Sequence, residues 1–157
     1  MSDVKRILYA EDSVEDVELT LAALEQNGLA NEVVVARDGV EAVEYLSRSG
    51  PFARRPAGNP AVVLLDIKMP RMDGLEVLRW IRGHAQLRAL PVVMLTSSRE
   101  EQDIIESYDL GVNAYVVKPV EFKEFMQAVR TLGLFWAILN EPAPGVNRLP
   151  EPRRRAA

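Results

Sequence analysis

Short apolar runs alternate with amphipathic segments along most of the chain, and this alternation predicts strands and helices in turn. The apolar or β-branched runs predict strands at Arg6–Ala10, Glu32–Ala36, Ala61–Leu65, Pro91–Leu95 and Ala114–Val117. Between and after them, helical spacing predicts helices at Val14–Gln26, at a segment carrying Val40, Val43, Tyr45 and Leu46 after the Asp38-Gly39 turn, at Gly74–Arg82, at Glu100–Leu110 and from about Glu121 to Leu139.

This order of elements favours an α/β fold with a parallel sheet between two layers of helices. Residues 61–65 are apolar throughout, as expected for a central strand that is covered on both faces. Right-handed crossovers leave few topologies, so we expect a flavodoxin-like (βα)5 doubly wound sheet of strand order 2-1-3-4-5. Residues 50–60 are expected to form a loop because of their glycines and prolines. The domain then covers residues 1–140 with an extended last helix, and 141–157 form an irregular tail containing Pro and Arg.

Polar residues follow four of the five predicted strands, where functional groups collect in open parallel sheets. Glu11 and Asp12 follow the first strand, Asp66 the third, Thr96 the fourth and Lys118 the fifth. Three neighbouring carboxylates repel one another and therefore favour a hard cation such as Mg²⁺. Asp66 suits a nucleophile for phosphoryl transfer, and Lys118 and Thr96 suit donors to phosphoryl oxygens. Singly, each residue fits a solvated strand end, but together they favour a site.

Four motifs resemble the receiver domains of two-component response regulators over about residues 5–132. They are Tyr-Ala-Glu-Asp-Ser at 9–13, Leu-Leu-Asp-Ile-Lys-Met-Pro-Arg-Met-Asp-Gly at 64–74, Leu-Thr-Ser at 95–97 and Val-Lys-Pro at 117–119. The resemblance implies a phosphorelay signalling protein that accepts a phosphoryl group from a histidine kinase. Such a protein assists its own phosphorylation and dephosphorylation but is not an enzyme in the ordinary sense.

The same resemblance assigns roles to individual residues. It makes Asp66 the phosphoacceptor, with Glu11 and Asp12 holding Mg²⁺ beside it and the backbone carbonyl of Lys68 as a further ligand. The Lys68 side chain, two residues past the phosphoacceptor, is expected to affect how long the phosphoryl group survives. Glu11 stands where Asp is commoner in the family, so we expect Asp12 to be the more direct ligand.

Two further residues form the expected switch. By resemblance, Thr96 moves toward the phosphoryl group while the ring of Tyr115 turns inward. The family also has a cis peptide bond at the position of Lys118-Pro119, which we carry over to this chain.

A narrower resemblance concerns the loop at 50–60, the run Asp-Leu-Gly-Val-Asn-Ala-Tyr at 109–115 and the run Leu-Phe-Trp-Ala-Ile-Leu-Asn-Glu-Pro at 134–142. These segments look similar to single-domain regulators paired with bacterial and cyanobacterial phytochrome kinases. A kinase of the bacteriophytochrome type is therefore the expected partner.

The last predicted helix carries a second apolar face besides its core face. Leu134, Phe135 and Ile138 lie opposite the stripe that would pack on the sheet. A patch of this kind marks a contact, and we expect a homodimer through this helix, with the tail folding back over it as the alternative. Signalling would then proceed through a conformational or dimerisation change.

Composition and charge limit the cellular location and the kinds of partner that we expect. The chain has 157 residues, a net charge of −4 and no cysteine, and it lacks both a secretion signal and an apolar run long enough to span a membrane. We therefore expect a cytoplasmic protein without membrane or nucleic-acid partners, and read Arg153–Arg155 as a solvated end.

Two other functions stay open. The chain could be the receiver fragment of a DNA-binding regulator. It could instead be a phosphatase with an aspartyl nucleophile, although such enzymes usually carry a second Asp two residues on, where this sequence has Lys68.

Overall fold

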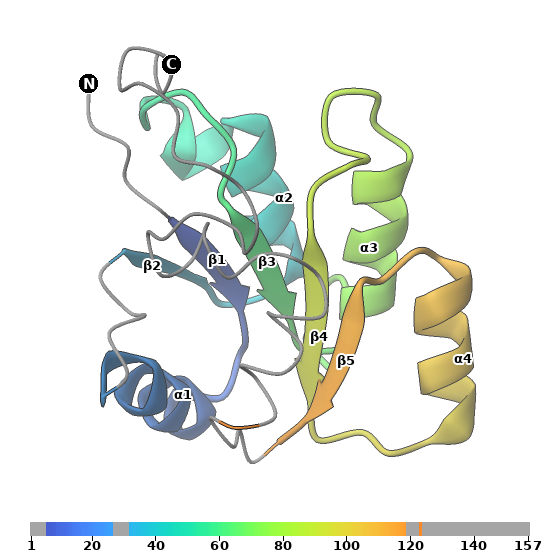
Figure 1. Ribbon diagram of the computed structural model, residues 1–157. Helices are drawn as coiled ribbons and strands as arrows, with labels where there is room; N and C mark the ends of the chain where they lie inside the picture. The colour runs from blue at the N-terminus through green and yellow to red at the C-terminus, as the bar shows by residue number, and fades with distance from the viewer. Residues whose placement is uncertain (1–5, 27–31, 119–122, 124–157) are drawn as a thin grey trace, which may run out of the picture.

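The computed structural model describes residues 6–26, 32–118 and 123, which form a parallel sheet flanked by helices (Figure 1). The strands are β1 (Ile7–Ala10), β2 (Val33–Ala36), β3 (Val62–Leu65), β4 (Val92–Thr96) and β5 (Ala114–Val117). The helices are α1 (Val14–Gln26), α2 (Gly39–Ser47), α3 (Gly74–Arg82) and α4 (Glu101–Asp109), with a short 3₁₀ helix η1 at Gly50–Phe52. The sheet order is β2-β1-β3-β4-β5, which confirms the predicted topology.

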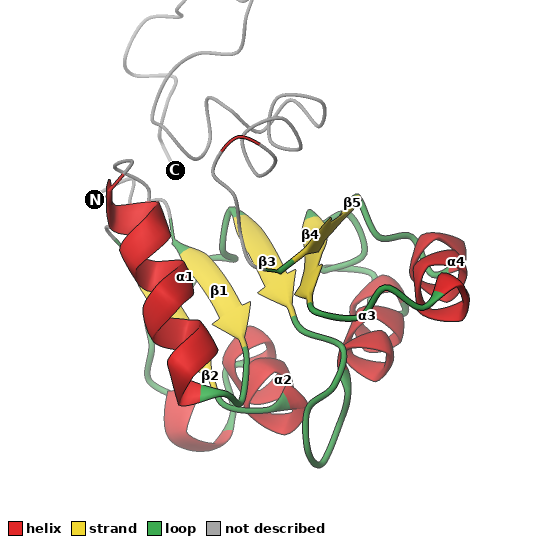
Figure 2. Ribbon diagram, turned by 90° about the horizontal axis from the view of Figure 1, so that it is seen from below, coloured by secondary structure: helices red, strands yellow, loops and turns green. Residues whose placement is uncertain are grey.

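The helices lie on both faces of the sheet, as a doubly wound fold requires (Figure 2). α1 covers one face, α2 and α3 cover the other, and α4 lies beyond α3 beside the β5 edge. Neighbouring strands are parallel throughout, with Ala10 opposite both Ala36 and Leu65 in the register. The residues that follow β1 and β3 therefore emerge side by side.

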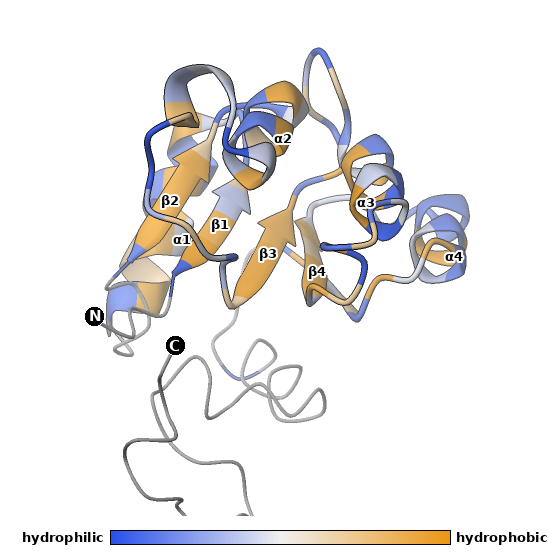
Figure 3. Ribbon diagram, turned by 90° about the horizontal axis from the view of Figure 1, so that it is seen from above, coloured by the Kyte–Doolittle hydropathy of each residue, from blue (hydrophilic) through white to orange (hydrophobic). Residues whose placement is uncertain are grey.

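Apolar strands form the centre of the molecule (Figure 3). Every residue of β1, β3 and β4 is buried, and the side chains of Leu8, Leu64 and Met94 are fully enclosed. The complete burial of β3 matches the uniform apolarity of its sequence. In the described part of the chain, no helix combines the length and apolarity needed to cross a membrane.

The segment 50–60 differs from the expected loop, because it begins with the 3₁₀ helix η1. Pro51 stands in its first turn, where a fixed φ and a missing N–H cost nothing. Phe52 meets the ring of Tyr45 on α2 edge to face, with 5.3 Å between ring centroids. The aromatic contact with α2 gives this breaker-rich segment a helical start.

Several predictions fall outside the described residues. These are the helix from Glu121 to Leu139 with its patch of Leu134, Phe135 and Ile138, the tail at 141–157, and the peptide bond between Lys118 and Pro119.

Tight backbone packing fixes the start of α3 against the end of β3. The N–H of Gly74 donates to the carbonyl of Ile67 over 2.9 Å. A Cβ at residue 74 would lie 2.2 Å from the carbonyl oxygen of Asp66, so only glycine fits. Asp73 caps the helix in a reciprocal capping box with Glu76. The loop after Asp66 is thus held at both of its ends.

Candidate functional site

Three carboxylates gather where β1 and β3 end. One oxygen from each of Glu11, Asp12 and Asp66 lies within 4.8 Å of the other two. The parallel register brings them together, and the backbone N–H of Asp66 donates to the carbonyl of Ala10 over 3.1 Å. Glu11 and Asp66 are buried while Asp12 is exposed, so the cluster has one open side. Its donor set is the one that hard divalent cations prefer.

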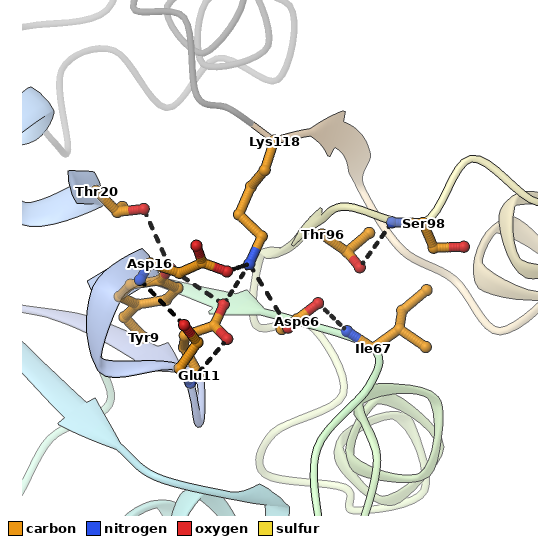
Figure 4. Close-up of polar contacts among 10 residues, drawn as sticks. Tyr9, Glu11, Asp16, Thr20, Asp66, Ile67, Thr96, Ser98 and Lys118 are labelled. Atoms are coloured by element: carbon orange, nitrogen blue, oxygen red, sulfur yellow. Dashed lines mark hydrogen bonds and ion pairs between the residues drawn. The ribbon is translucent and has the colours of Figure 1, made fainter. Parts of the chain in front are cut away.

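Lys118 enters this cluster from the end of β5 (Figure 4). Its ammonium donates to Glu11 Oε1 over 2.6 Å and to Asp16 Oδ2 over 2.7 Å. Asp66 Oδ2 lies farther away, at 3.6 Å. Burial by itself would lower the pKa of Lys118, but the bonds to Asp16 and Glu11 and the charge of Asp66 raise it overall. Lys118 therefore stays protonated among these carboxylates.

Glu11 is the most enclosed of the three acids. Its carboxylate accepts the Tyr9 hydroxyl over 3.4 Å and the backbone N–H of Ser13 over 3.2 Å. Burial and the nearby charge of Asp66 raise the pKa of Glu11, against the opposing effect of Lys118. The Tyr9 hydroxyl shares its single proton between Glu11 and the Thr20 hydroxyl on α1, which lies 3.2 Å away, and this ties the Glu11 carboxylate to the packing of that helix.

The predicted switch residues both contact Ser98, in the segment after β4. Thr96 is the last residue of β4 and fully buried, and its hydroxyl accepts the backbone N–H of Ser98 over 3.3 Å. The Tyr115 hydroxyl donates to the carbonyl of Ser98 over 3.0 Å. The Ser98 hydroxyl donates in turn to Asp103 on α4 over 2.6 Å. One short segment therefore connects Thr96, Tyr115 and α4.

Comparisons with known proteins identify the family that has this arrangement of residues. The family model for the response regulator receiver domain matches residues 7–130. This chain belongs to the response regulator receiver domain family. Among solved structures, it is 62% identical to the bacteriophytochrome response regulator AtBRR, with a TM-score of 0.79 over 88% of this chain and 99% of that one.

Two cyanobacterial regulators are also similar. Response regulator Rcp1 of Synechocystis sp. is 37% identical over 84% of this chain and 88% of its own length. A crystal structure of Mn²⁺-bound Rcp1 has a TM-score of 0.71 and covers 90% of this chain and 100% of that one. The phosphorylated cyanobacterial phytochrome response regulator RcpA is 38% identical, with a TM-score of 0.71 over 90% of this chain and 99% of that one. The chain is a two-component response regulator of the group that includes phytochrome response regulators.

The receiver domain thus brings together Glu11, Asp12, Asp66 and Lys118, as the sequence predicted. The backbone N–H of Ile67 donates to Asp66 Oδ1 over 2.8 Å and orients that carboxylate. Lys68 lies exposed in the following loop, and the roles given to its carbonyl and side chain stay predictions.

Sequence reasoning missed Asp16, Tyr9 and Thr20 around the same site. Asp16 and Thr20 are one helical turn apart, beside the apolar stripe of α1, and therefore face the same neighbours. That spacing of two polar residues beside the buried face was the available signal. Tyr9 gave none, because an aromatic residue in a buried strand is ordinary core.

Proposed function

We propose that this receiver domain accepts a phosphoryl group on Asp66 from a histidine kinase. The observation that carries the proposal is the placement of the Asp66 carboxylate within 4.8 Å of two further acids and 3.6 Å from the Lys118 ammonium. In the transfer, an Asp66 oxygen attacks phosphorus, a new O–P bond forms, and the N–P bond to the kinase histidine breaks. Asp66 is held by Ile67 in a nearly enclosed position, so it is presented to a donor in one orientation.

The acid cluster fits Mg²⁺, with Glu11, Asp12 and Asp66 as carboxylate ligands and the carbonyl of Lys68 as a proposed fourth. The ion would neutralise charge on the phosphoryl oxygens during transfer. Lys118 and Thr96 would donate to the phosphoryl oxygens of the product.

Phosphorylation would then shift the population toward a second conformation. Thr96 would exchange its contact with the Ser98 N–H for a phosphoryl oxygen, and Tyr115 would turn inward from its bond to the Ser98 carbonyl. The contacts of Ser98 with both residues and with α4 support this route from the site to the surface.

The phosphodonor we propose is a phytochrome-type histidine kinase, because the chain is 62% identical, over 88% of its length, to a bacteriophytochrome response regulator. We also propose that two copies pair through the last helix, with Leu134, Phe135 and Ile138 in the contact and the cytoplasm as the setting. Phe135→Asp should then give a monomer at micromolar concentration by light scattering, and a retained dimer would refute this contact.

Acyl-phosphate formation tests the central claim. Purified protein is incubated with acetyl phosphate and Mg²⁺, and phosphoryl transfer is followed by intact mass. Asp66→Asn should abolish the modification, whereas Asp109→Asn, which changes an exposed acid at the end of α4, should leave it unchanged. Modification of Asp66→Asn at the rate of the parent would refute the site.

A further inference from the structure

Lys118 is shared between the acid cluster and a carboxylate outside it. Asp16 lies in the first turn of α1 and does not belong to the group formed by Glu11, Asp12 and Asp66. Its oxygen nevertheless holds the Lys118 ammonium at 2.7 Å, almost a full ångström closer than the oxygen of Asp66. Figure 4 shows Asp16 and Asp66 on opposite sides of this ammonium group.

We propose that Asp16 is a positioning residue that holds Lys118 away from Asp66 and competes with the phosphoryl group for it. The proposal rests on phosphorylation of Asp66 and adds to it a residue that sets how strongly the phosphorylated state is favoured.

The geometry indicates which bond of Lys118 is given up. The Lys118 ammonium lies 3.6 Å from Asp66 Oδ2, beyond the about 3.2 Å of a good hydrogen bond, so we infer that it turns toward Asp66 when a phosphoryl group is attached there. Glu11 is nearly fully buried and fixed by Tyr9 and Ser13, so water cannot take the place of the Lys118 ammonium at its carboxylate.

Asp16 differs from Glu11 in its access to water. Its side chain is 38% exposed, whereas that of Glu11 is 1% exposed. Water can therefore solvate the Asp16 carboxylate once the ammonium leaves, and little is lost. The Asp16 bond is the one that breaks when Lys118 turns to the phosphoryl group, and its strength counts against that movement.

A neutral residue at position 16 should therefore favour the phosphorylated state. Asp16→Asn keeps the shape and one acceptor but removes the charge, which weakens the hydrogen bond to the ammonium. The affinity for beryllofluoride, a stable mimic of the phosphoryl group, should rise about fivefold in the presence of Mg²⁺, a modest coupling between sites.

Isothermal titration with beryllofluoride and Mg²⁺ measures this affinity in the parent, Asp16→Asn, Asp16→Glu and Glu15→Gln. Glu15 is an exposed neighbour on α1, so its variant removes the same charge without touching Lys118 and should change affinity less than about twofold. Asp16→Glu should restore the parent value. Unfolding curves show that each variant is folded.

A second measurement follows Lys118 itself, without beryllofluoride. The amine is modified with an N-hydroxysuccinimide ester and quantified by peptide mass spectrometry, with Lys118→Arg to identify the peptide. Asp16→Asn should raise the modification rate severalfold and Glu15→Gln should not. Unchanged reactivity shows that Asp16 does not hold Lys118 and overturns the inference, even if the parent binds beryllofluoride.

If the parent binds beryllofluoride and Asp16→Asn binds it equally or more weakly, the proposed competition is wrong. That result leaves the proposal that Asp66 is phosphorylated unaffected. A parent that binds no beryllofluoride refutes the proposed function and the competition with it.

Discussion

Helices α3 and α4 have the same length of nine residues, yet they are attached to the molecule very differently. Val77, Leu78 and Ile81 of α3 are fully buried against the sheet. In α4 the only buried residue is Ser107, and Ile105 and Tyr108 are about half exposed, at 48% and 51%. The two helices follow the two halves of the site, α3 after Asp66 and α4 after Thr96.

The N-termini of α3 and α4 also differ, in how they are capped. α3 starts with the capping box of Asp73 and Glu76, whereas Glu100, at the same position before α4, makes no side-chain capping bond. A well-packed, capped helix gives Asp66 a fixed support, while a loosely packed helix can move with little loss of burial. For the conformational change that we propose, this contrast favours a route through Ser98 and α4 over one through α3.

Gly74→Ala should have the largest effect, because it breaks the fixed support. The added Cβ would overlap the carbonyl oxygen of Asp66, so α3 must shift away from the site. We expect a loss of about 2–3 kcal/mol in the free energy of unfolding by urea titration. Gly83→Ala is the matched control at the other end of α3, where a Cβ would meet its nearest atom at 3.4 Å. Equal losses for both variants would contradict this account.

Capping provides the next test. Asp73→Ala removes the side-chain acceptor for the Glu76 N–H and should cost about 1 kcal/mol of stability. Glu100→Ala, at the same position before α4, should change stability by less than about 0.5 kcal/mol, because no capping bond is lost. A larger loss for Glu100→Ala would reverse the assignment of the fixed and the movable helix.

Ser107→Ala should change stability in the opposite direction. The Ser107 hydroxyl is buried, and among the described residues no hydrogen-bond partner meets it. Alanine removes this unsatisfied group and has the higher helix propensity, so stability should rise by about 0.5–1 kcal/mol. Ser47→Ala on α2 is the control, because it removes a hydroxyl that donates to the Val43 carbonyl. Its gain in stability should therefore be smaller. A loss of stability in Ser107→Ala would show that α4 packs more tightly than we infer.

Acidic pH should weaken the attachment of the loop before α3, where Arg71 pairs with Asp38, the N-cap residue of α2. Burial alone would raise the pKa of Asp38, but the guanidinium of Arg71 and the N–H of Glu41 lower it below its usual value. A carboxyl whose pKa is lower in the folded state stabilises the fold above about pH 4, and this contribution disappears as pH falls through the folded value.

Urea titrations at pH 7 and pH 3 should therefore show a smaller decrease for Asp38→Asn than for the parent. The effect should be the smallest of the four, because the Arg71 side chain is 56% exposed and water weakens the pair. An equal decrease in both proteins would remove Asp38 from the acid response.

Most of the fold could be read from the sequence because its signals are local. Strand runs such as 61–65 and turn residues such as Asp38 act through their immediate neighbours, and the predicted helices and strands that lie within the described residues agree with the structure within two residues at their ends. The 3₁₀ helix at Gly50–Phe52 was missed because its glycine and proline are loop signals, although Pro51 suits a first helical turn and Phe52 contacts Tyr45.

The site was predictable as a set of residues but not as a set of contacts. Strand ends placed Asp66 and Lys118 at one edge, because parallel topology follows from the alternation of elements. The position of the Lys118 ammonium between Glu11 and Asp16 depends on side-chain packing across α1 and β5, which no local pattern encodes. The spacing of Asp16 and Thr20 indicates a shared face of α1, but it does not indicate the contact of Asp16 with Lys118.

The hydrogen bond between Glu11 and Lys118 joins residues 107 positions apart, at the ends of β1 and β5. A contact of such long range has a larger loop-closure cost than a local one, so we expect it to form late in folding. A chain that is still folding, or still being synthesised, has Asp66 but not the cation beside it. We therefore expect the proposed phosphorylation of Asp66 to begin only when the sheet is complete. An incompletely folded copy would then not become phosphorylated.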